Sequence, residues 1–339
     1  MAKRCYILGA GFSKACGLPL ASKLTEAVMR YCNNQDAELG PDAFRETIEQ
    51  QRTFIHELFP QCDLNTSYPD FEELITVLDE WEDYRRACGG GTDEFIHNLK
   101  TSLLQNLNAL LCDEVSEAKK TDSFKSVQGF VKRACMEQSS IVSFNWDLLL
   151  EVAAKSIELE VVYQKPRAED VKALCLAKPH GSLNLAELSE QDWEEKKNAI
   201  NVAPRDMKTE WRDELTGIRV LRIQNPATDP KGMVYTLGPI IVPPATRKVY
   251  ESPWITRQWC LALDMVRNAE EVVIIGYSLP ETDIRPRLLI QLARFRREKD
   301  IPVTLIDPCG EKLRTRYEHI LCKSFKIIDQ NWEAVTNSL

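Results

Sequence analysis

The chain has 339 residues, of which 44% are hydrophobic and 28% are charged, and its formal net charge is −8 at pH 7. This composition is typical of a globular protein with one large domain or two intertwined ones. The acidic balance argues against a protein that coats nucleic acid, because such proteins are usually basic. No stretch approaches the roughly 18 uninterrupted apolar residues that cross a bilayer, so no membrane span is expected.

Eleven cysteines are scattered along the chain, and no two of them form a CxxC pair. That spacing argues against a zinc ribbon, so we expect no zinc and no other bound metal. The apolar stretch near the N-terminus is too short for a signal peptide. Together with the odd number of cysteines, this predicts free thiols and a cytoplasmic location, where the environment is reducing.

The chain first shows the pattern of a nucleotide-binding βαβ unit, with a strand, a glycine turn and a helix at residues 5–8, 9–11 and 20–31. The stretch 33–135 differs, because its apolar residues recur at helical spacing. Within it, Asp70 is a good N-cap and Glu73 completes a capping box. We interpret 33–135 as a helical insertion.

The pattern of a sheet domain resumes near residue 136. We predict further strands and helices at 141–144, 159–163, 174–180, 220–223, 253–268, 271–275, 286–297 and 302–306, of which 253–268 and 286–297 are the helices. Residues 185–215 are charged and mixed, and we expect helix and surface loop there. Strands alternating with helices predict an α/β fold with a Rossmann-like, doubly wound, mostly parallel sheet and a helical insertion after the first βα unit.

Ligands of doubly wound sheets bind at the carboxyl ends of the strands. The first strand runs into a turn made of Gly9, Ala10, Gly11, Phe12 and Ser13. Glycine lacks the Cβ that would hold the backbone away from a pyrophosphate, and the N–H groups of the next helix can then bind the anion. The match to the GxGxxG fingerprint is incomplete, because a lysine replaces the third glycine. A plain tight turn is the alternative.

Two more strand ends carry polar residues that suit catalysis. Asn145 and Asp147 follow the strand at 141–144, and His180 stands in the sequence KPHGSLN at the end of the strand at 174–180. An imidazole titrates near neutral pH and can accept or relay a proton. The alternatives are structural: a turn residue at 145, a helix N-cap at 147 and a structural histidine at 180.

The last strand ends carry Gly276, Ser278 and Asp307. Ser278 can reach a phosphate or a ribose hydroxyl, and Asp307 can accept hydrogen bonds from an adenosine ribose. A turn aspartate is the alternative for Asp307. Asp283 follows in the sequence GYSLPETD, where an N-cap of the next helix is the simplest interpretation.

Taken in order, these motifs resemble those of the sirtuin superfamily, in particular the sirtuin-like domains of bacterial antiphage defence proteins, which hydrolyse NAD. The matching residues are Gly9-Ala10-Gly11 with Ser13 and Gly17-Leu18-Pro19, Asn145 with Asp147, His180-Gly181, and Gly276 with Ser278 and Leu279. The sequence YPDFEELITVLDE also resembles a helix of the bacterial branch. The resemblance covers most of the chain outside much of the insertion and residues 185–215.

The chain also departs from the deacylating sirtuins. Those proteins carry a four-cysteine zinc ribbon and an aspartate-phenylalanine-arginine run after the glycine motif, and this chain has neither. Phe144 stands where the family usually has glutamine before the asparagine. These differences argue against acyl-lysine chemistry and leave the residues expected around NAD in place.

The resemblance implies that residues 1–32 and 136–339 form a sirtuin-type NAD-binding domain that cleaves NAD+ into nicotinamide and ADP-ribose. Breaking the nicotinamide–ribose bond passes through a transition state with oxocarbenium character, which needs groups that orient ribose, stabilise charge and place water. Asn145 would hold the ribose and the water, Asp147 would accept from the nicotinamide carboxamide, and His180 would act as the base. The NAD-binding residues would be Gly9, Ala10, Gly11, Phe12, Ser13, Gly276, Ser278 and Asp307.

Other functions stay open. The protein would otherwise be an NAD or ADP-ribose sensor without turnover, or a protein deacylase or ADP-ribosyltransferase, for which no peptide groove is evident in the sequence. As a defence effector it would deplete NAD only when activated. The resemblance therefore implies control by homo-oligomerisation or by a separately encoded partner, such as a HerA-type ATPase or an Argonaute-type protein. We expect no membrane association and no direct binding of nucleic acid.

Overall fold

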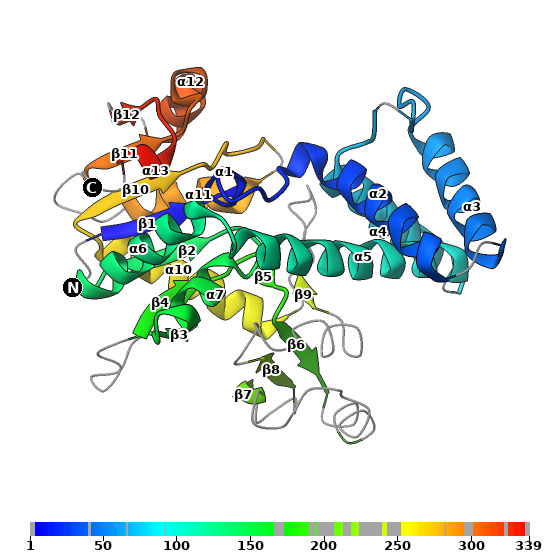
Figure 1. Ribbon diagram of the computed structural model, residues 1–339, viewed down its shortest axis with the longest axis horizontal. Helices are drawn as coiled ribbons and strands as arrows, with labels where there is room; N and C mark the ends of the chain where they lie inside the picture. The colour runs from blue at the N-terminus through cyan, green and yellow to red at the C-terminus, as the bar shows by residue number, and fades with distance from the viewer. Residues whose placement is uncertain are drawn as a thin grey trace.

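The computed structural model describes residues 4–39, 42–65, 67–91, 93–165, 173–189, 194, 207–212, 218–223, 239–242, 252–281, 283–294, 301–321 and 325–335. Its centre is a seven-stranded sheet in the order β12-β11-β10-β1-β2-β4-β3, in which every pairing is parallel (Figure 1). The strands are β1 (Arg4–Leu8), β2 (Ser140–Ser143), β3 (Glu160–Val162), β4 (Ala173–Ala177), β10 (Glu271–Ile275), β11 (Val303–Ile306) and β12 (Lys326–Ile328). The predicted Rossmann-like, doubly wound α/β fold is confirmed.

Both faces of this sheet are covered, which explains why its strands are apolar runs. Successive side chains of β1 alternate between two cores: Tyr6 and Leu8 enter one, and Cys5 and Ile7 enter the other. Helices α6 (Asp122–Met136) and α7 (Leu149–Ser156) pack in the first core. Helices α10 (Pro253–Asn268), α11 (Ile284–Arg294) and α12 (Gly310–Leu321) contribute to the second.

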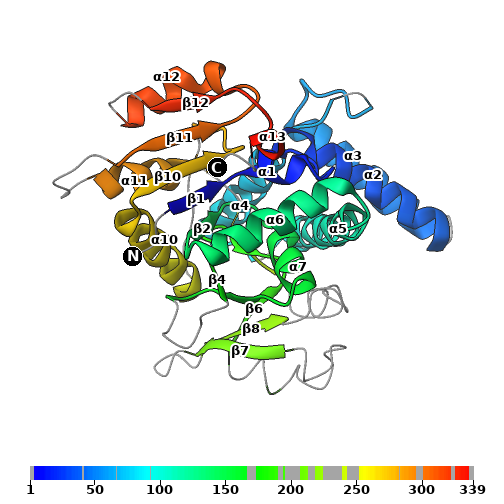
Figure 2. The same ribbon diagram turned by 60° about the vertical axis from the view of Figure 1, so that its left-hand side comes forward.

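The helices α2 (Ala21–Leu39), α3 (Asp42–Leu58), α4 (Phe71–Ala87) and α5 (Glu94–Ala118) extend to one side of the sheet, as both ribbon views show (Figures 1 and 2). As predicted, Asp70 caps α4, and its side chain accepts a hydrogen bond from the Glu72 N–H. Helix α6, of which all but the last residue falls in the range 33–135, packs against α7, β2 and β4. Among the residues that the structure describes, no helix combines the length and apolar character needed to cross a bilayer.

Two small antiparallel sheets lie beyond β4, namely β5 (Gly181–Ser182) with β9 (Ile240–Ile241), and β6 (Leu185–Leu188) with β8 (Arg219–Ile223) and β7 (Met207–Arg212). The expectation of helix and loop over 185–215 is therefore wrong for residues 185–188 and 207–212. Both segments are strands because they pair with β8, which is distant in the sequence. Such pairing overrides local propensity.

Candidate active site

The turns that follow β1, β2, β4, β10 and β11 meet at the carboxyl edge of the sheet and line one cavity of about 1180 Å³. Strand β1 lies between β2 and β10, so the strand order reverses here, which is where doubly wound sheets bind ligands. All the predicted site residues except Phe12 line this cavity: Gly9, Ala10, Gly11, Ser13, Asn145, Asp147, His180, Gly276, Ser278 and Asp307. Turns far apart in the sequence thus converge on one space.

Phe12 has a different place from the one predicted. Its ring is buried and stacks on Trp332 of α13 (Trp332–Val335) with centroids 4.4 Å apart, and it also packs against Phe130. The Trp332 indole N–H donates to the Phe12 carbonyl at 3.0 Å. Phe12 therefore anchors the glycine turn to the core beneath it and does not line the cavity.

The glycine turn packs directly on the turn after β10. The Gly11 N–H donates to the Gly276 carbonyl at 2.8 Å, and a Cβ at Gly11 would lie 2.7 Å from the Gly276 Cα. A Cβ at Gly9 would lie 2.6 Å from the Tyr277 Cα. The glycines are thus required first by contact between two protein turns. The Gly11 N–H is already bonded to the Gly276 carbonyl, and anion binding by the other N–H groups of this turn stays a prediction.

Asn145 follows β2 and has a fixed orientation. Its Nδ2 donates to the Gly9 carbonyl and to the Ser13 Oγ, each at 3.0 Å. A carbonyl oxygen only accepts, so this contact assigns the amide nitrogen and leaves Oδ1 as the remaining side-chain acceptor. Within the described part of the chain no partner contacts Oδ1, and Asn145 lines the cavity.

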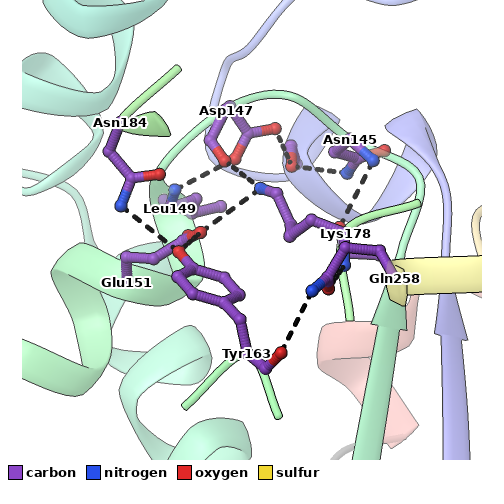
Figure 3. A network of polar contacts seen from close by, with 10 residues as sticks. Asn145, Asp147, Leu149, Glu151, Tyr163, Lys178, Asn184 and Gln258 are labelled. Atoms are coloured by element: carbon purple, nitrogen blue, oxygen red, sulfur yellow. Dashed lines mark hydrogen bonds and ion pairs between the residues drawn. The ribbon is translucent and has the colours of Figure 1, made fainter. Parts of the chain in front are cut away.

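Asp147 lies behind Asn145 in the same hydrogen-bond chain. Its Oδ2 accepts from the Ser13 Oγ at 2.8 Å, and its Oδ1 accepts from the Leu149 N–H at 3.0 Å (Figure 3). Since Ser13 accepts from Asn145 and donates to Asp147, the three side chains form a directed relay. Both oxygens of Asp147 already accept bonds from the protein, so this carboxylate positions Ser13 and Asn145.

Burial, opposed most by the nearby charge of Lys178, raises the pKa of Asp147 above its ordinary value of 3.8. A raised pKa means that the folded state binds this proton more tightly than the unfolded chain does, so the contribution of Asp147 to stability falls as pH rises above about 4. We therefore expect the free energy of unfolding lost in Asp147→Ala to be larger near pH 4.5 than at pH 7. Urea unfolding of both proteins at the two pH values checks this, and an equal or opposite difference contradicts it.

His180 follows β4 and is buried in an aromatic surround. Its ring lies 4.9 Å from that of Phe144 and 5.8 Å from that of Trp259, centroid to centroid. Its Nε2 lies 3.4 Å from the Oδ1 of Asp283, and the Tyr277 hydroxyl donates to the Oδ2 of the same carboxylate. Asp283 thus pairs with the imidazole, a role that the N-cap interpretation of the sequence missed.

Ser278 and Asp307 complete the wall at the ends of β10 and β11. The Asp307 Oδ1 accepts from the Cys309 N–H at 2.7 Å, which is the turn contact that the sequence offered as the alternative. Asp307 also lines the cavity, so the turn contact fixes a carboxylate at its edge. Ser278 is exposed, and its backbone carbonyl accepts a hydrogen bond from the Arg316 side chain at 2.7 Å.

The charges around the cavity are uneven. The start of α4 contributes three acidic residues, Asp70, Glu72 and Glu73, to the lining. Lys14 is the one lysine or arginine among the described lining residues. An anionic group in this cavity is therefore favoured near Lys14 and disfavoured near α4. In the described part of the chain, no group of three or more His, Cys, Asp or Glu side chains is arranged to hold a metal ion.

No family model matches the chain, and no curated protein matches its sequence. Solved structures of Sir2 enzymes do match. One, from work on the mechanism and regulation of these enzymes, has a TM-score of 0.42 and 12% identity and covers 99% of this chain and 90% of its own. A complex of a Sir2 homologue with ADP-ribose has a TM-score of 0.43 and 11% identity with the same coverage. At these scores the likeness carries no weight for ligand or reaction, which depend on the site itself.

Proposed function

We propose that the cavity binds NAD+ and hydrolyses its nicotinamide–ribose bond to give nicotinamide and ADP-ribose. The observation that carries the proposal is that an oriented amide oxygen, on Asn145, and a carboxylate-paired imidazole, on His180, line one cavity beside the glycine turn. At about 1180 Å³ the cavity is slightly larger than the range of roughly 300–1,000 Å³ seen for ligand pockets. A dinucleotide is a ligand of that size.

The chemistry follows from what each group presents. The Oδ1 of Asn145 accepts hydrogen bonds from the attacking water or the nicotinamide ribose, and its partial negative charge stabilises the oxocarbenium-like transition state. His180 takes the proton that water loses, directly or through a ribose hydroxyl, and Asp283 stabilises the imidazolium that results. Water adds to the ribose C1′, nicotinamide leaves with the electrons of the broken bond, and one proton is released.

The charge distribution orients the ligand. The two phosphates lie toward Lys14 and the glycine turn, away from the carboxylates at the start of α4. Asp307 then accepts from the hydroxyls of the adenosine ribose, as acidic residues at strand ends do in dinucleotide sites. The nicotinamide ribose is left between Asn145 and His180. Asp147, predicted to contact the nicotinamide carboxamide, acts in this proposal through Ser13 and Asn145.

The Asp283→Asn variant keeps the shape of the side chain and removes its charge. Groups that orient a catalytic side chain through a hydrogen bond commonly contribute roughly 10–100-fold to activity, and we expect a loss of that size in kcat. The expected pH–rate profile shifts its acidic limb to lower pH, because the imidazolium loses its counter-charge. Tyr277→Phe, which removes only the hydroxyl bonded to Asp283, serves as the milder comparison. An unshifted pH profile with full kcat contradicts the role of Asp283.

Chromatography of NAD+ after incubation with the purified protein tests the proposal. We expect nicotinamide and ADP-ribose in equal amounts, and turnover by Asn145→Ala reduced by roughly 10²–10³-fold, as for loss of a preorganised electrostatic group. Tight ADP-ribose binding without turnover would instead identify a sensor. Formation of O-acyl-ADP-ribose with an acylated peptide would identify a deacylase.

We further propose that turnover is regulated and that the protein is an NAD-depleting effector of antiphage defence, controlled by self-assembly or by a separate partner. Three exposed aromatic side chains of α4 and α5, Trp81, Tyr84 and Phe95, support an interaction surface on the projecting helices. Measuring specific activity over a range of protein concentrations tests self-assembly. A rate per molecule that is maximal in the isolated monomer would contradict it.

A further inference from the structure

A buried ion pair lies directly behind the candidate site. Lys178 and Glu151 have side chains only 1% and 4% exposed, and the Lys178 Nζ lies 3.4 Å from the Glu151 Oε1. Neither residue lines the cavity. Burying two charges is expensive, so a lysine here needs a physical reason beyond stability.

The shortest contact of the lysine points to that reason. Its Nζ donates to the backbone carbonyl of Asp147 at 2.7 Å, which is closer than its contact with Glu151 (Figure 3). Two residues further along the chain from Lys178 stands His180, and the Gly181 N–H closes a turn on the Lys178 carbonyl at 2.9 Å. The side chain therefore holds the turn that carries Asn145 while its own backbone leads into the turn that carries His180.

The ion pair is itself held from several elements. The Tyr163 hydroxyl donates to the Glu151 Oε1 at 2.8 Å and accepts from the Asn184 Nδ2 at 3.2 Å. On the other side, the Gln258 amide accepts from the Lys178 N–H at 3.1 Å and donates to the Tyr163 carbonyl at 3.0 Å. Figure 3 shows Tyr163 and Asn184 meeting beside Glu151, and Gln258 beside the backbone of the lysine. The ammonium group is thus fixed in place, with Glu151 on α7 as its counter-charge.

We propose that Lys178 is a positioning residue that clamps the Asn145–Asp147 turn against the His180 turn, with Glu151 neutralising its charge. For its rate readout this inference rests on the proposed function. The clamp sets the separation between the amide oxygen and the imidazole, to which the reaction is sensitive because a misplacement of about 1 Å can cost roughly 10²-fold in rate.

Two variants separate positioning from stability. Lys178→Met leaves the Glu151 carboxylate buried without its counter-charge, and we expect Tm to fall by roughly 5–10 °C. Lys178→Met with Glu151→Gln removes both charges and keeps an acceptor for Tyr163, so we expect most of this loss to be recovered. The Asp147 carbonyl still lacks its clamp in the double variant. We therefore expect its kcat to stay roughly 10–100-fold below wild type while KM changes little.

Amide hydrogen exchange tests the positioning role of Lys178 without depending on NAD+ turnover. The Leu149 N–H bonds to the Asp147 side chain and the Leu183 N–H bonds to the Trp146 carbonyl, so both amides report on this turn. Both should exchange faster in the double variant than in wild type. Val127→Ala in the core face of α6 is the control, because it lowers stability without touching the site. Its kcat and the exchange of these two amides should match wild type.

The outcomes are distinct. Recovery of kcat together with Tm in the double variant, or unchanged exchange of the Leu149 and Leu183 amides, overturns the clamp and leaves a structural ion pair. If wild-type protein releases no nicotinamide from NAD+, the proposed function fails, and the exchange experiment alone then decides the clamp. The clamp is supported if the double variant turns over NAD+ slowly although its Tm is restored, and if its Leu149 and Leu183 amides exchange faster than in wild type.

Discussion

The His180→Ala variant is expected to lose roughly 10²–10⁴-fold in kcat for NAD+ cleavage, the usual contribution of a positioned general base. His180 is the one histidine in the wall of the described cavity, and its pairing with Asp283 at 3.4 Å holds the imidazole in a buried aromatic surround. The measurement is the rate of nicotinamide release at saturating NAD+, normalised to folded protein. ADP-ribose binding should survive, because the phosphates and adenosine ribose are held by other turns.

A matched variant tests whether the activity lost in His180→Ala comes from loss of the imidazole or from disturbed packing around it. Trp259→Phe alters a ring 5.8 Å from the imidazole and retains His180 and Asp283, so it should keep most of the activity. The role of His180 as base is contradicted if His180→Ala, folded and able to bind ADP-ribose, releases nicotinamide at the wild-type rate. It is also contradicted if Trp259→Phe loses as much activity as His180→Ala.

The Gly276→Ala variant is expected to lose about 4 kcal/mol or more in free energy of unfolding, at the extreme end of single substitutions. Gly276 has φ +59°, and a Cβ there would lie 2.4 Å from the Phe12 nitrogen and 2.5 Å from the Gly11 carbonyl carbon. Both neighbours are backbone atoms of the glycine turn, so the clash is relieved only by separating the turns after β1 and β10. NAD+ turnover should be lost with the shape of the cavity.

Gly17→Ala separates this clash from backbone strain. Gly17 also has a positive φ, +95°, but no atom lies within 4 Å of the position of an added Cβ. Only conformational strain is then expected, about 1–2 kcal/mol. Denaturant unfolding of the two variants measures the difference. Equal losses would show that the contact between the two turns contributes nothing.

The sequence is enough to predict the sheet and the edge at which the site lies. Apolar runs at β1, β2, β10 and β11 are bounded by turn residues, and a parallel sheet places all their carboxyl ends on one edge. For that reason residues as distant as Gly9, Asn145 and Asp307 are predictable as neighbours. Local patterns also suffice for the helix predicted at 253–268, which is α10.

What the sequence does not reveal are the partners of these residues. The pairing of Asp283 with His180, and of Lys178 with Glu151, depends on contacts across the fold that leave no local pattern. The sequence does carry one indication of such a pair, which is Lys178 directly after the apolar strand β4. A lysine next to a buried strand needs a partner if it is buried, because lysine is rarely buried unless it is paired. The strands β6 and β7 were missed for a similar reason, because each is defined by its pairing with β8.

The glycine turn shows a third limit. A glycine-rich turn after a strand predicts a close approach of the backbone, but not what approaches it. In this protein the approaching group is the turn at Gly276, and the Gly11 N–H is bonded to it. Only the three-dimensional structure distinguishes that contact from a phosphate.

The proposed mechanism requires that one ribose fits between Asn145 and His180. A crystal structure of the Asn145→Ala variant with NAD+ tests this directly, because slowed cleavage preserves the ligand. We predict electron density for NAD+ with its nicotinamide ribose beside His180, its phosphates toward Lys14 and its adenosine ribose at Asp307. NAD+ bound elsewhere, or with its phosphates against the carboxylates of α4, would contradict the proposed mechanism.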